Sequence, residues 1–273
     1  MKKIFLLLFC LLLALALAAC AKPAPANPVI RLSTTTSVND SGLLPYMQPA
    51  FEAKTGYWLE ITSGGSGAAI KLGETGDADC LLVHSQAAEE EFVASGFGVE
   101  RIPFMYNYFV IVGPVDDPLK LADCANATEA FQVIAQSKTT EFVSRGDDSG
   151  THNAEKNIWS AAAIEPIGQS WYISAGAGMG ACLNQASERQ AYILTDKATF
   201  LSMADSLDLR ILLEQSEEMK NTYSLIAVNQ EKHAGVNSEG AKAFIDWMQS
   251  AEAKNLIATY GVSLYGEALF YNL

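Results

Sequence analysis

Hydroxyl side chains gather after two apolar segments near the start of the chain. Five hydroxyl residues in a row occupy 33–37, and the sequence Ser-Gly-Gly-Ser-Gly occupies 63–67. Capping the helix expected after the first run needs only one hydroxyl. The glycines of the second run let backbone N–H groups turn toward a common point, and the helix start that follows adds a partial positive charge. Both loops are therefore suited to an anion, with these candidate ligands: Thr35, Thr36, Ser37, Ser66 and Gly67.

A third loop, residues 144–152, combines a permanent cation with the expected start of a helix. Arg145 offers a planar fork of N–H donors, which matches a small dianion. The residues that would add hydroxyls and helix-terminal amides are Ser149, Gly150 and Thr151. Asp147 and Asp148 would repel an anion, so we expect at least one of them to brace Arg145 or cap the helix. A fourth loop, after another predicted strand, adds Thr195 as a weaker candidate.

The same loop suggests two other kinds of chemistry. A metal site would use Asp147, Asp148, His152 and Glu155, because His152 and Glu155 lie one helical turn apart. A cation next to Arg145 is electrostatically unfavourable, however. A hydrolase would use Ser149 or Ser66 with His152, but no Gly-x-Ser-x-Gly motif and no separately placed orienting acid accompanies them. Both alternatives are weaker than anion binding.

The elements that must position these loops alternate between strand and helix from residue 29 onward, which is the pattern of parallel βαβ units. The first series consists of strands at 29–33, 57–62 and 80–84 and helices at 41–54, 67–72 and 87–95. Pro45 is tolerable in the first turn of the helix at 41–54, and Gly56 can end it in the left-handed conformation. The second series runs through 139–144, 149–159, 171–174, 180–187, 191–195 and 209–213, and helices are expected near 238–249 and 251–260.

Two longer extended runs, 104–112 and 223–228, flank the second series. They predict an α/β fold of two lobes joined by two crossing strands, with lobe 1 at 29–112 and 223–273 and lobe 2 at 113–222. Ligands of such sheets bind at the carboxyl ends of strands, so we expect the site in a cleft between the lobes. The aromatic residues of the first run are expected to pack at the junction: Phe104, Tyr106, Tyr108 and Phe109.

The first residues are typical of an export signal. Lys2 and Lys3 precede an apolar run at 4–19, which ends in Leu17-Ala18-Ala19-Cys20. This ending resembles the lipobox of bacterial lipoproteins, whose cysteine is acylated after cleavage. We therefore expect residues 1–19 to be removed and 20–28 to form a short tether lipidated at Cys20. The alternative is an uncleaved membrane anchor, and both place the domain outside the cytoplasm.

Composition argues against a nucleic-acid partner and against a zinc site. The 273 residues carry 18 basic and 31 acidic side chains, a net charge of −13. A nucleic-acid binder needs a basic face, so we expect no nucleic-acid partner. Besides Cys10 and Cys20, the chain has Cys80, Cys124 and Cys182, without metal-binding spacing. Zinc is disfavoured, and at most one disulfide, Cys124 with Cys182, can form.

Several motifs together resemble the tungstate-binding proteins of bacterial ABC transporters. They occupy 34–37 with 40–44, 73–79 with 81–84, 105–114, 144–152 with Glu155, and 191–196. The TTTS and SRGDDSGTHxxE sequences are typical of that family. One departure lies in the second loop, where relatives usually carry Gly-Thr-Gly and this chain has Ser66 at the threonine position.

The resemblance implies the type II periplasmic-binding-protein fold and a monomer that captures tungstate or molybdate for its ABC permease. It implies no cofactor, resident metal or enzymatic activity. Tungstate is a tetrahedral dianion without a proton at neutral pH, so its site needs only donors. Phosphate carries a proton and needs an acceptor. The sequence 145–151 also resembles the loop of phosphate-binding proteins, which keeps phosphate or another tetrahedral oxyanion as an alternative ligand. A further alternative is a receptor domain that senses the anion without transporting it.

Overall fold

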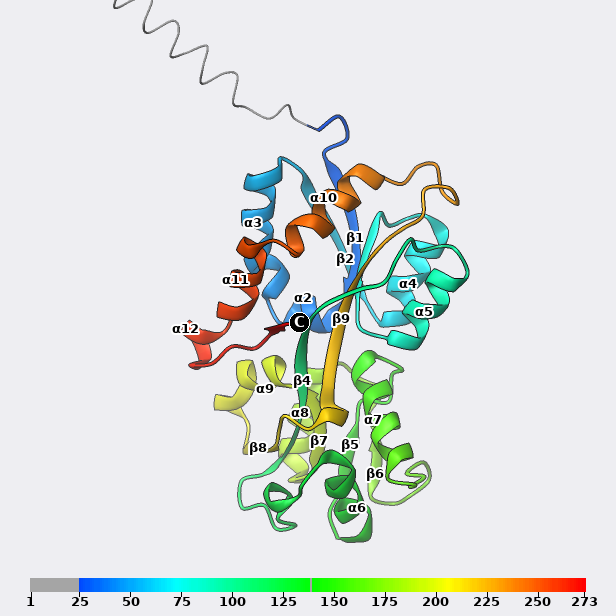
Figure 1. Cartoon of the computed structure of the whole chain (residues 1–273). Helices are drawn as coiled ribbons and strands as arrows, with labels where there is room; N and C mark the ends of the chain where they lie inside the picture. Colours follow the sequence, from blue (N-terminus) through cyan, green and yellow to red (C-terminus); the bar gives the residue numbers. More distant parts are fainter. Residues whose placement is uncertain (1–24, 138) are drawn as a thin grey trace, which may run out of the picture.

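A computed structural model describes residues 25–137 and 139–273. The expected signal peptide at 1–19 and the expected lipid attachment at Cys20 lie outside the described residues, as does most of the tether. Within the described ranges, no helix has the length and apolar character needed to cross a bilayer. Two lobes lie one below the other, and the long strands β4 (Ile102–Pro114) and β9 (Lys220–Ala227) run between them (Figure 1).

The described strands form one ten-stranded sheet in the order β2-β1-β3-β9-β4-β7-β5-β6, with β8 and β10 also paired to β4. Parallel pairing joins β1 to β2 and β3 in the first lobe, and β5 to β6 and β7 in the second. The predicted βαβ pattern is therefore confirmed in both lobes. The remaining strands are β1 (Val29–Thr35), β2 (Trp58–Gly64), β3 (Cys80–Val83), β5 (Phe142–Ser144), β6 (Tyr172–Ser174), β7 (Tyr192–Asp196), β8 (Leu209–Leu213) and β10 (Tyr271–Asn272).

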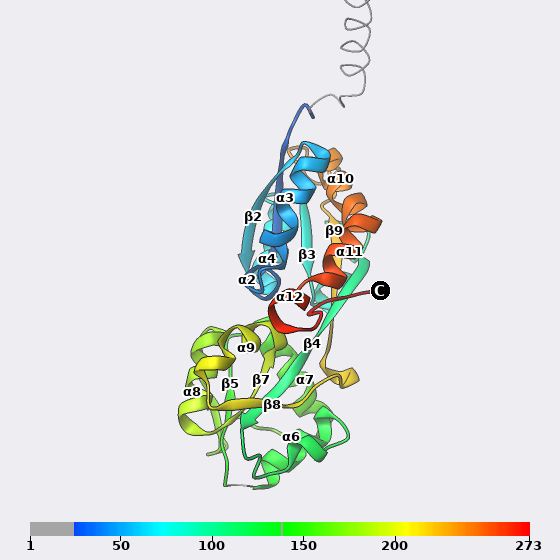
Figure 2. The ribbon, with the colours of Figure 1, turned by 90° about the vertical axis from the view of Figure 1, so that its left-hand side faces the viewer.

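Strand β4 belongs to both lobes. Its residues 102–108 pair with β9, and its residues 109–114 pair with β7 and β8. Figure 2 shows the same strand descending from one lobe into the other. The extended runs expected at 104–112 and 223–228 are thus present as β4 and β9. The exact lobe boundaries at 112/113 and 222/223 stay a prediction.

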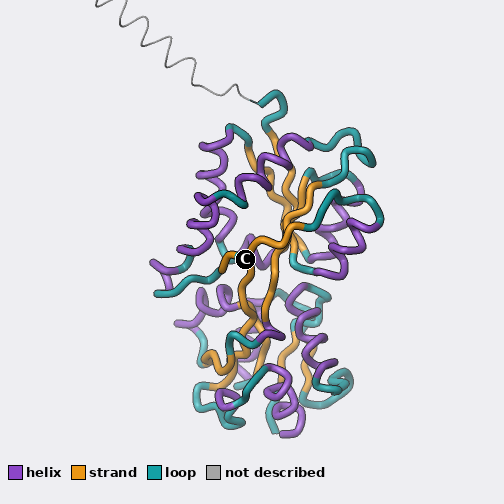
Figure 3. Tube along the Cα trace, in the orientation of Figure 1, coloured by secondary structure: helices purple, strands orange, loops and turns teal. Residues whose placement is uncertain are grey.

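Helices flank the strands of each lobe on both sides (Figure 3). The helix expected at 41–54 begins later, at Leu43, because Gly42 takes the left-handed conformation at its start (φ 84°). A separate short helix, which the sequence did not indicate, precedes it. The helices are α2 (Thr36–Asp40), α3 (Leu43–Thr55), α4 (Ser66–Thr75), α5 (Gln86–Ala94), α6 (Ala127–Ser137), α7 (Gly150–Ala161), α8 (Met179–Arg189), α9 (Lys197–Met203), α10 (Ser238–Met248), α11 (Ala251–Thr259) and α12 (Val262–Tyr265).

Each lobe has apolar cores on both sides of its strands. In the first lobe, one core surrounds Phe51 and Phe244, and another surrounds Phe92 under α4 and α5. In the second, Trp159 packs among Phe131 and Phe142, with its ring centroid 4.2 Å from that of Phe131. Each lobe therefore has cores of its own, and α9 of the second lobe adds Ala198 and Leu201 to the core around Phe51 and Phe244. Movement about the crossing strands would leave most of the core packing intact but would separate α9 from the first lobe.

The aromatic residues of β4 pack as expected at the junction. Phe104 belongs to a first-lobe core and Phe109 to a second-lobe core. Tyr106 stacks on Tyr271 with ring centroids 5.2 Å apart, and Tyr108 meets Tyr106 edge to face. Cys80, Cys124 and Cys182 are free thiols, so the Cys124–Cys182 disulfide does not form in the structure. Cys124 and Cys182 lie against different cores of the second lobe, which keeps them apart.

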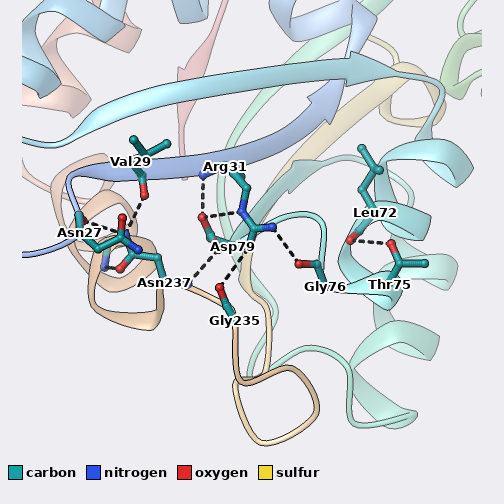
Figure 4. Close-up of polar contacts among 10 residues, drawn as sticks. Asn27, Val29, Arg31, Leu72, Thr75, Gly76, Asp79, Gly235 and Asn237 are labelled. Atoms are coloured by element: carbon teal, nitrogen blue, oxygen red, sulfur yellow. Dashed lines mark hydrogen bonds and ion pairs between the residues drawn. The ribbon is translucent and has the colours of Figure 1, made fainter.

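A partly buried ion pair, with a buried carboxylate and a one-third exposed guanidinium, lies at the end of the first lobe away from the hydroxyl-rich loops. The Arg31 guanidinium lies between Asp79 and the Gly76 carbonyl (Figure 4), with Nη2 2.6 Å from Asp79 Oδ1. The Asp79 carboxylate also accepts hydrogen bonds from the backbone N–H groups of Arg31 and Asn237. It therefore ties β1, β3 and the start of α10 together. This arrangement satisfies a carboxylate that is almost fully buried.

Candidate anion site

A small polar cavity lies where the loops after β1, β2 and β5 meet. Its volume is about 10 Å³, roughly the space of one water-sized sphere and far below the roughly 300–1,000 Å³ of pockets that hold organic ligands. Three helices, α2, α4 and α7, begin beside it. Their unpaired N-terminal N–H groups favour an anion. The residues that line it are Thr35, Thr36, Ser37, Gly64, Gly65, Ser66, His84, Arg145, Ser149, Gly150 and Thr151.

The hydroxyl run after β1 divides into structural and cavity-lining members. Ser33 donates to the Ala69 carbonyl at 3.0 Å and Thr34 to the Leu82 carbonyl at 2.8 Å, so both are used within the lobe. The remaining three, Thr35, Thr36 and Ser37, line the cavity, and their contact with an anion stays a prediction. The Thr35 hydroxyl is 3.1 Å from Ser37 Oγ and does not cap α2.

Ser66 stands at the first position of α4, and its hydroxyl faces no partner in the part of the chain that the structure describes. The residue is 3% exposed, and its Oγ has no hydrogen-bond partner among the described residues. Leaving a buried hydroxyl unpaired costs free energy, so a bound group that accepts from it would be stabilised. Gly67, the next residue, is exposed and does not line the cavity. The lining glycines of this loop are instead Gly64 and Gly65, which sequence reasoning did not select.

Arg145 enters the cavity from the second lobe and is held by a carboxylate. Its Nε is 2.8 Å from Asp147 Oδ2, and the side chain is 13% exposed. The other Asp147 oxygen accepts from the Ser149 backbone N–H at 3.1 Å. Burial would raise the pKa of Asp147, but hydrogen bonds from Ser149 and Arg145 outweigh it and lower that pKa. The expected bracing of Arg145 is therefore present.

The turn that carries Arg145 requires glycine at position 146. Gly146 has φ 64°, and a Cβ at this position would lie 2.1 Å from Ser174 Oγ. Ser149 then caps α7, accepting from the His152 backbone N–H at 3.4 Å. Capping by Ser149 leaves the N–H groups of Gly150 and Thr151 at the helix start. Both residues line the cavity, so this loop contributes amides as well as a guanidinium.

The geometry does not favour the metal or hydrolase alternatives. No group of three potential metal-ligating side chains occurs among the described residues. His152 Nδ1 accepts from the Asp148 backbone N–H at 2.9 Å instead of facing the Ser149 hydroxyl. Glu155 is buried and accepts from Tyr172 Oη at 2.8 Å and Trp159 Nε1 at 3.1 Å. These side chains support the helix that begins at the cavity.

Two sequence expectations differ from what the structure brings together. Thr195 is fully buried in β7, its hydroxyl donates to the Asp196 carbonyl at 3.2 Å, and it does not line the cavity. Conversely, His84 lines the cavity and its Nε2 is 3.1 Å from Ser37 Oγ. His84 was not among the candidate ligands expected from the sequence. The available signal was its position directly after a buried strand, at the same carboxyl end of the sheet as the hydroxyl-rich loops.

Comparison with known proteins places the chain in a family. A family model described as a PBP superfamily domain matches residues 22–252. A tungstate-binding protein TupA from Peptoclostridium acidaminophilum is 46% identical over 95% of this chain and 94% of its own length. The chain belongs to the tungstate-binding protein family of the PBP superfamily. A further member, TupA from Campylobacter jejuni, is 40% identical over 82% of this chain and 84% of its own length.

Solved structures of the tungstate-binding protein family share the fold. The tungstate-binding protein TupA from Desulfovibrio alaskensis G20 matches with a TM-score of 0.82 at 40% identity, covering 90% of this chain and 99% of that one. The tungstate ABC transporter structure from Geobacter sulfurreducens gives 0.77 at 42% identity, over 85% and 98%. The expected type II periplasmic-binding-protein fold is therefore confirmed. The names of these relatives describe binding and transport, which agrees with the expectation of a binding protein and not an enzyme.

Proposed function

We propose that this protein is the extracytoplasmic binding component of a tungstate ABC transporter. It captures tungstate, or the similar molybdate ion, in the cavity between its lobes and presents it to a permease. The observation that carries this proposal is the convergence of three helix N-termini, the unpaired Ser66 hydroxyl and Arg145 on one small cavity. Family membership supports the same assignment.

The donors of the cavity suit an anion that carries no proton. The proposed ligands are hydroxyls of the first loop, Ser66, Arg145 and the amides of the α7 start. Asp147 does not line the cavity, and both its oxygens already accept hydrogen bonds. A protonated anion such as hydrogen phosphate would therefore face donors without a free carboxylate to accept its proton. We leave Thr195 out of the ligand set because its hydroxyl is used within β7.

Binding is proposed to close the cleft between the lobes. The loops after β1 and β2 belong to the first lobe, and the loop with Arg145 belongs to the second. An anion held by both would favour the closed arrangement, with movement about β4 and β9. The net charge of −13 does not attract an anion, so hydrogen-bond donors close to the anion must supply the affinity. Salt at physiological strength screens the repulsion from distant surface carboxylates within about 8 Å.

Export and anchoring complete the proposal. The segment 1–19 would direct secretion and leave Cys20 as a lipidated N-terminus, with 20–28 as the tether. A monomer held in this way would stay near its permease. Mass spectrometry of the mature protein purified from membranes tests this part, and an unmodified Cys20 or a retained signal would contradict it.

Isothermal titration calorimetry with tungstate, molybdate, phosphate and sulfate tests the anion assignment. We expect tungstate and molybdate to bind with one site per chain and at least a hundredfold more tightly than phosphate. Phosphate binding of equal strength would replace tungstate with a general oxyanion function. No heat with any of the four ions would contradict anion capture altogether.

A further inference from the structure

His84 touches the first anion-binding loop from the end of β3. Its Nε2 is 3.1 Å from Ser37 Oγ, and Ser37 Oγ is 3.1 Å from Thr35 Oγ1. The imidazole ring centroid also lies 4.9 Å from that of Tyr223 on β9. His84 thus joins a cavity-lining hydroxyl pair to one of the two crossing strands.

A second contact links His84 to the other lobe. A Cβ added to Gly150 would lie 2.1 Å from His84 Cε1, so the ring packs directly on the backbone at the start of α7. Gly150 is not among the glycines with positive φ. Its conformation is therefore open to any residue, and alanine is a better helix former than glycine. Glycine is needed here for the close approach of His84.

The contact between His84 and Gly150 separates two spaces. Both residues line the small anion cavity, and both also line a larger groove beside Arg101, Asn153 and Lys220. Burial lowers the pKa of His84 to about 4, although a hydrogen bond with the Asn221 side chain opposes this change. The ring is therefore neutral at neutral pH and can pack against Gly150 without hydration of a charge. Asn221 is itself fixed by its 2.9 Å hydrogen bond to Asn107 on β4.

We propose that His84 is a positioning residue for anion capture, which seals the cavity against Gly150 when the lobes meet and holds Ser37 in place. This inference rests on the proposed anion-binding function. His84 contacts Ser37 in its own lobe, Gly150 in the other lobe and Tyr223 on a crossing strand. Removing the ring would open the cavity toward the groove and release the first loop, and enlarging Gly150 would keep the lobes from closing fully.

A double-mutant cycle in the mature chain tests this role, with tungstate affinity measured by calorimetry. Gly150→Ala keeps the backbone N–H, so its effect reports the added methyl group. We expect Gly150→Ala to weaken tungstate binding at least tenfold and His84→Ala to weaken it to a similar extent. In the double variant the collision is gone, so Gly150→Ala should cost less than twofold in the His84→Ala background. Equal costs in both backgrounds would overturn the proposal.

Three controls separate this role from folding and from the proposed function. The midpoint temperature of thermal unfolding without anion should be unchanged or higher for Gly150→Ala, since lobe closure is not needed for folding. His84→Gln retains a polar group near Ser37 and should bind at least threefold more tightly than His84→Ala. His233→Ala, a change of the same kind far from the cavity, should leave affinity unchanged. If the wild-type chain does not bind tungstate, the proposed function is contradicted. If the wild-type chain binds tungstate but the affinity losses of the two single variants add up in the double variant, only the role of His84 is contradicted.

Discussion

At the scale of single residues, the cavity shows how the same side-chain type serves two purposes. Ser33 and Thr34 donate to backbone carbonyls inside the lobe, whereas Thr35 and Ser66 keep hydroxyls at the cavity. Alternation along β1 places Ser33 and Thr35 on the same face, so it does not separate the two groups. Thr35 differs because it is the last residue of β1, directly before the start of α2. The sequence predicted a hydroxyl-rich anion loop, but only tertiary contacts distinguish the members that face the cavity.

Replacement of Arg145 tests the electrostatic part of this site. Arg145→Ala removes the cationic side chain of the cavity lining, and its loss should cost about 2 kcal/mol or more of binding free energy. This corresponds to an increase in the dissociation constant for tungstate of about thirtyfold or more. Arg145→Lys keeps the charge but not the planar fork that meets Asp147, so we expect an intermediate loss. Calorimetry measures all three proteins.

That comparison needs a control showing that the variants remain folded. Asp147 loses its ion pair in Arg145→Ala, so thermal unfolding without anion should be measured in parallel. Unchanged tungstate affinity in Arg145→Ala would contradict the assignment of this residue to the site.

At the scale of elements, the strands were more predictable than the helices. Buried apolar segments such as Cys80–Val83 were predicted within a residue, because four consecutive buried positions leave a clear apolar run. The short helix α2 was missed, since five residues are too few for a periodic pattern. His84 was not recognised as a cavity residue because its significance depends on Gly150, 66 positions away in the chain and in the other lobe.

Helix α7 contains a buried carboxyl group, that of Glu155, whose ionisation affects the free energy of unfolding. Burial raises the pKa of Glu155 from 4.5 to about 7, against hydrogen bonds from Tyr172 and Trp159 that lower it. Between these values the folded protein holds a proton that the unfolded chain has released. The folded state therefore loses stability as pH rises from about 4.5 through about 7. Above this range the charged carboxylate costs on the order of 3 kcal/mol.

The variant Glu155→Gln tests this coupling by urea unfolding at pH 5 and pH 8. Glutamine can accept from Trp159 and Tyr172 but does not ionise. We expect the stability of the variant relative to wild type to increase by on the order of 2 to 3 kcal/mol between pH 5 and pH 8. Glu188→Gln, on an exposed face of α8, provides the control without such a change. A difference for Glu155→Gln that is independent of pH would show that the carboxyl is not protonated at pH 5 in the folded state.

At the scale of the whole molecule, the two lobes meet at a shared lysine outside the anion cavity. Lys197, at the start of α9, lies 2.6 Å from Glu214 and 2.7 Å from Glu267, and its side chain is 11% exposed. Burial would lower the pKa of Lys197, but the two carboxylates outweigh it and raise that pKa. Glu214 belongs to the second lobe with Lys197, whereas Glu267 follows α12 in the first lobe, which adjoins α9 in Figure 2. The pair with Glu267 therefore forms only when the lobes are together.

This asymmetry allows a matched test of lobe closure. Glu267→Gln breaks only the ion pair between lobes, and Glu214→Gln breaks only the one within the second lobe. The two carboxylates are exposed to almost the same extent, 43% and 42%. A partly exposed pair contributes about 1 kcal/mol at most, so Glu267→Gln should raise the dissociation constant for tungstate up to fivefold. Glu214→Gln should leave it unchanged, because Lys197 keeps its partner across the cleft. Equal effects of the two variants, or none from Glu267→Gln at low salt, would mean that Lys197 does not stabilise the closed arrangement.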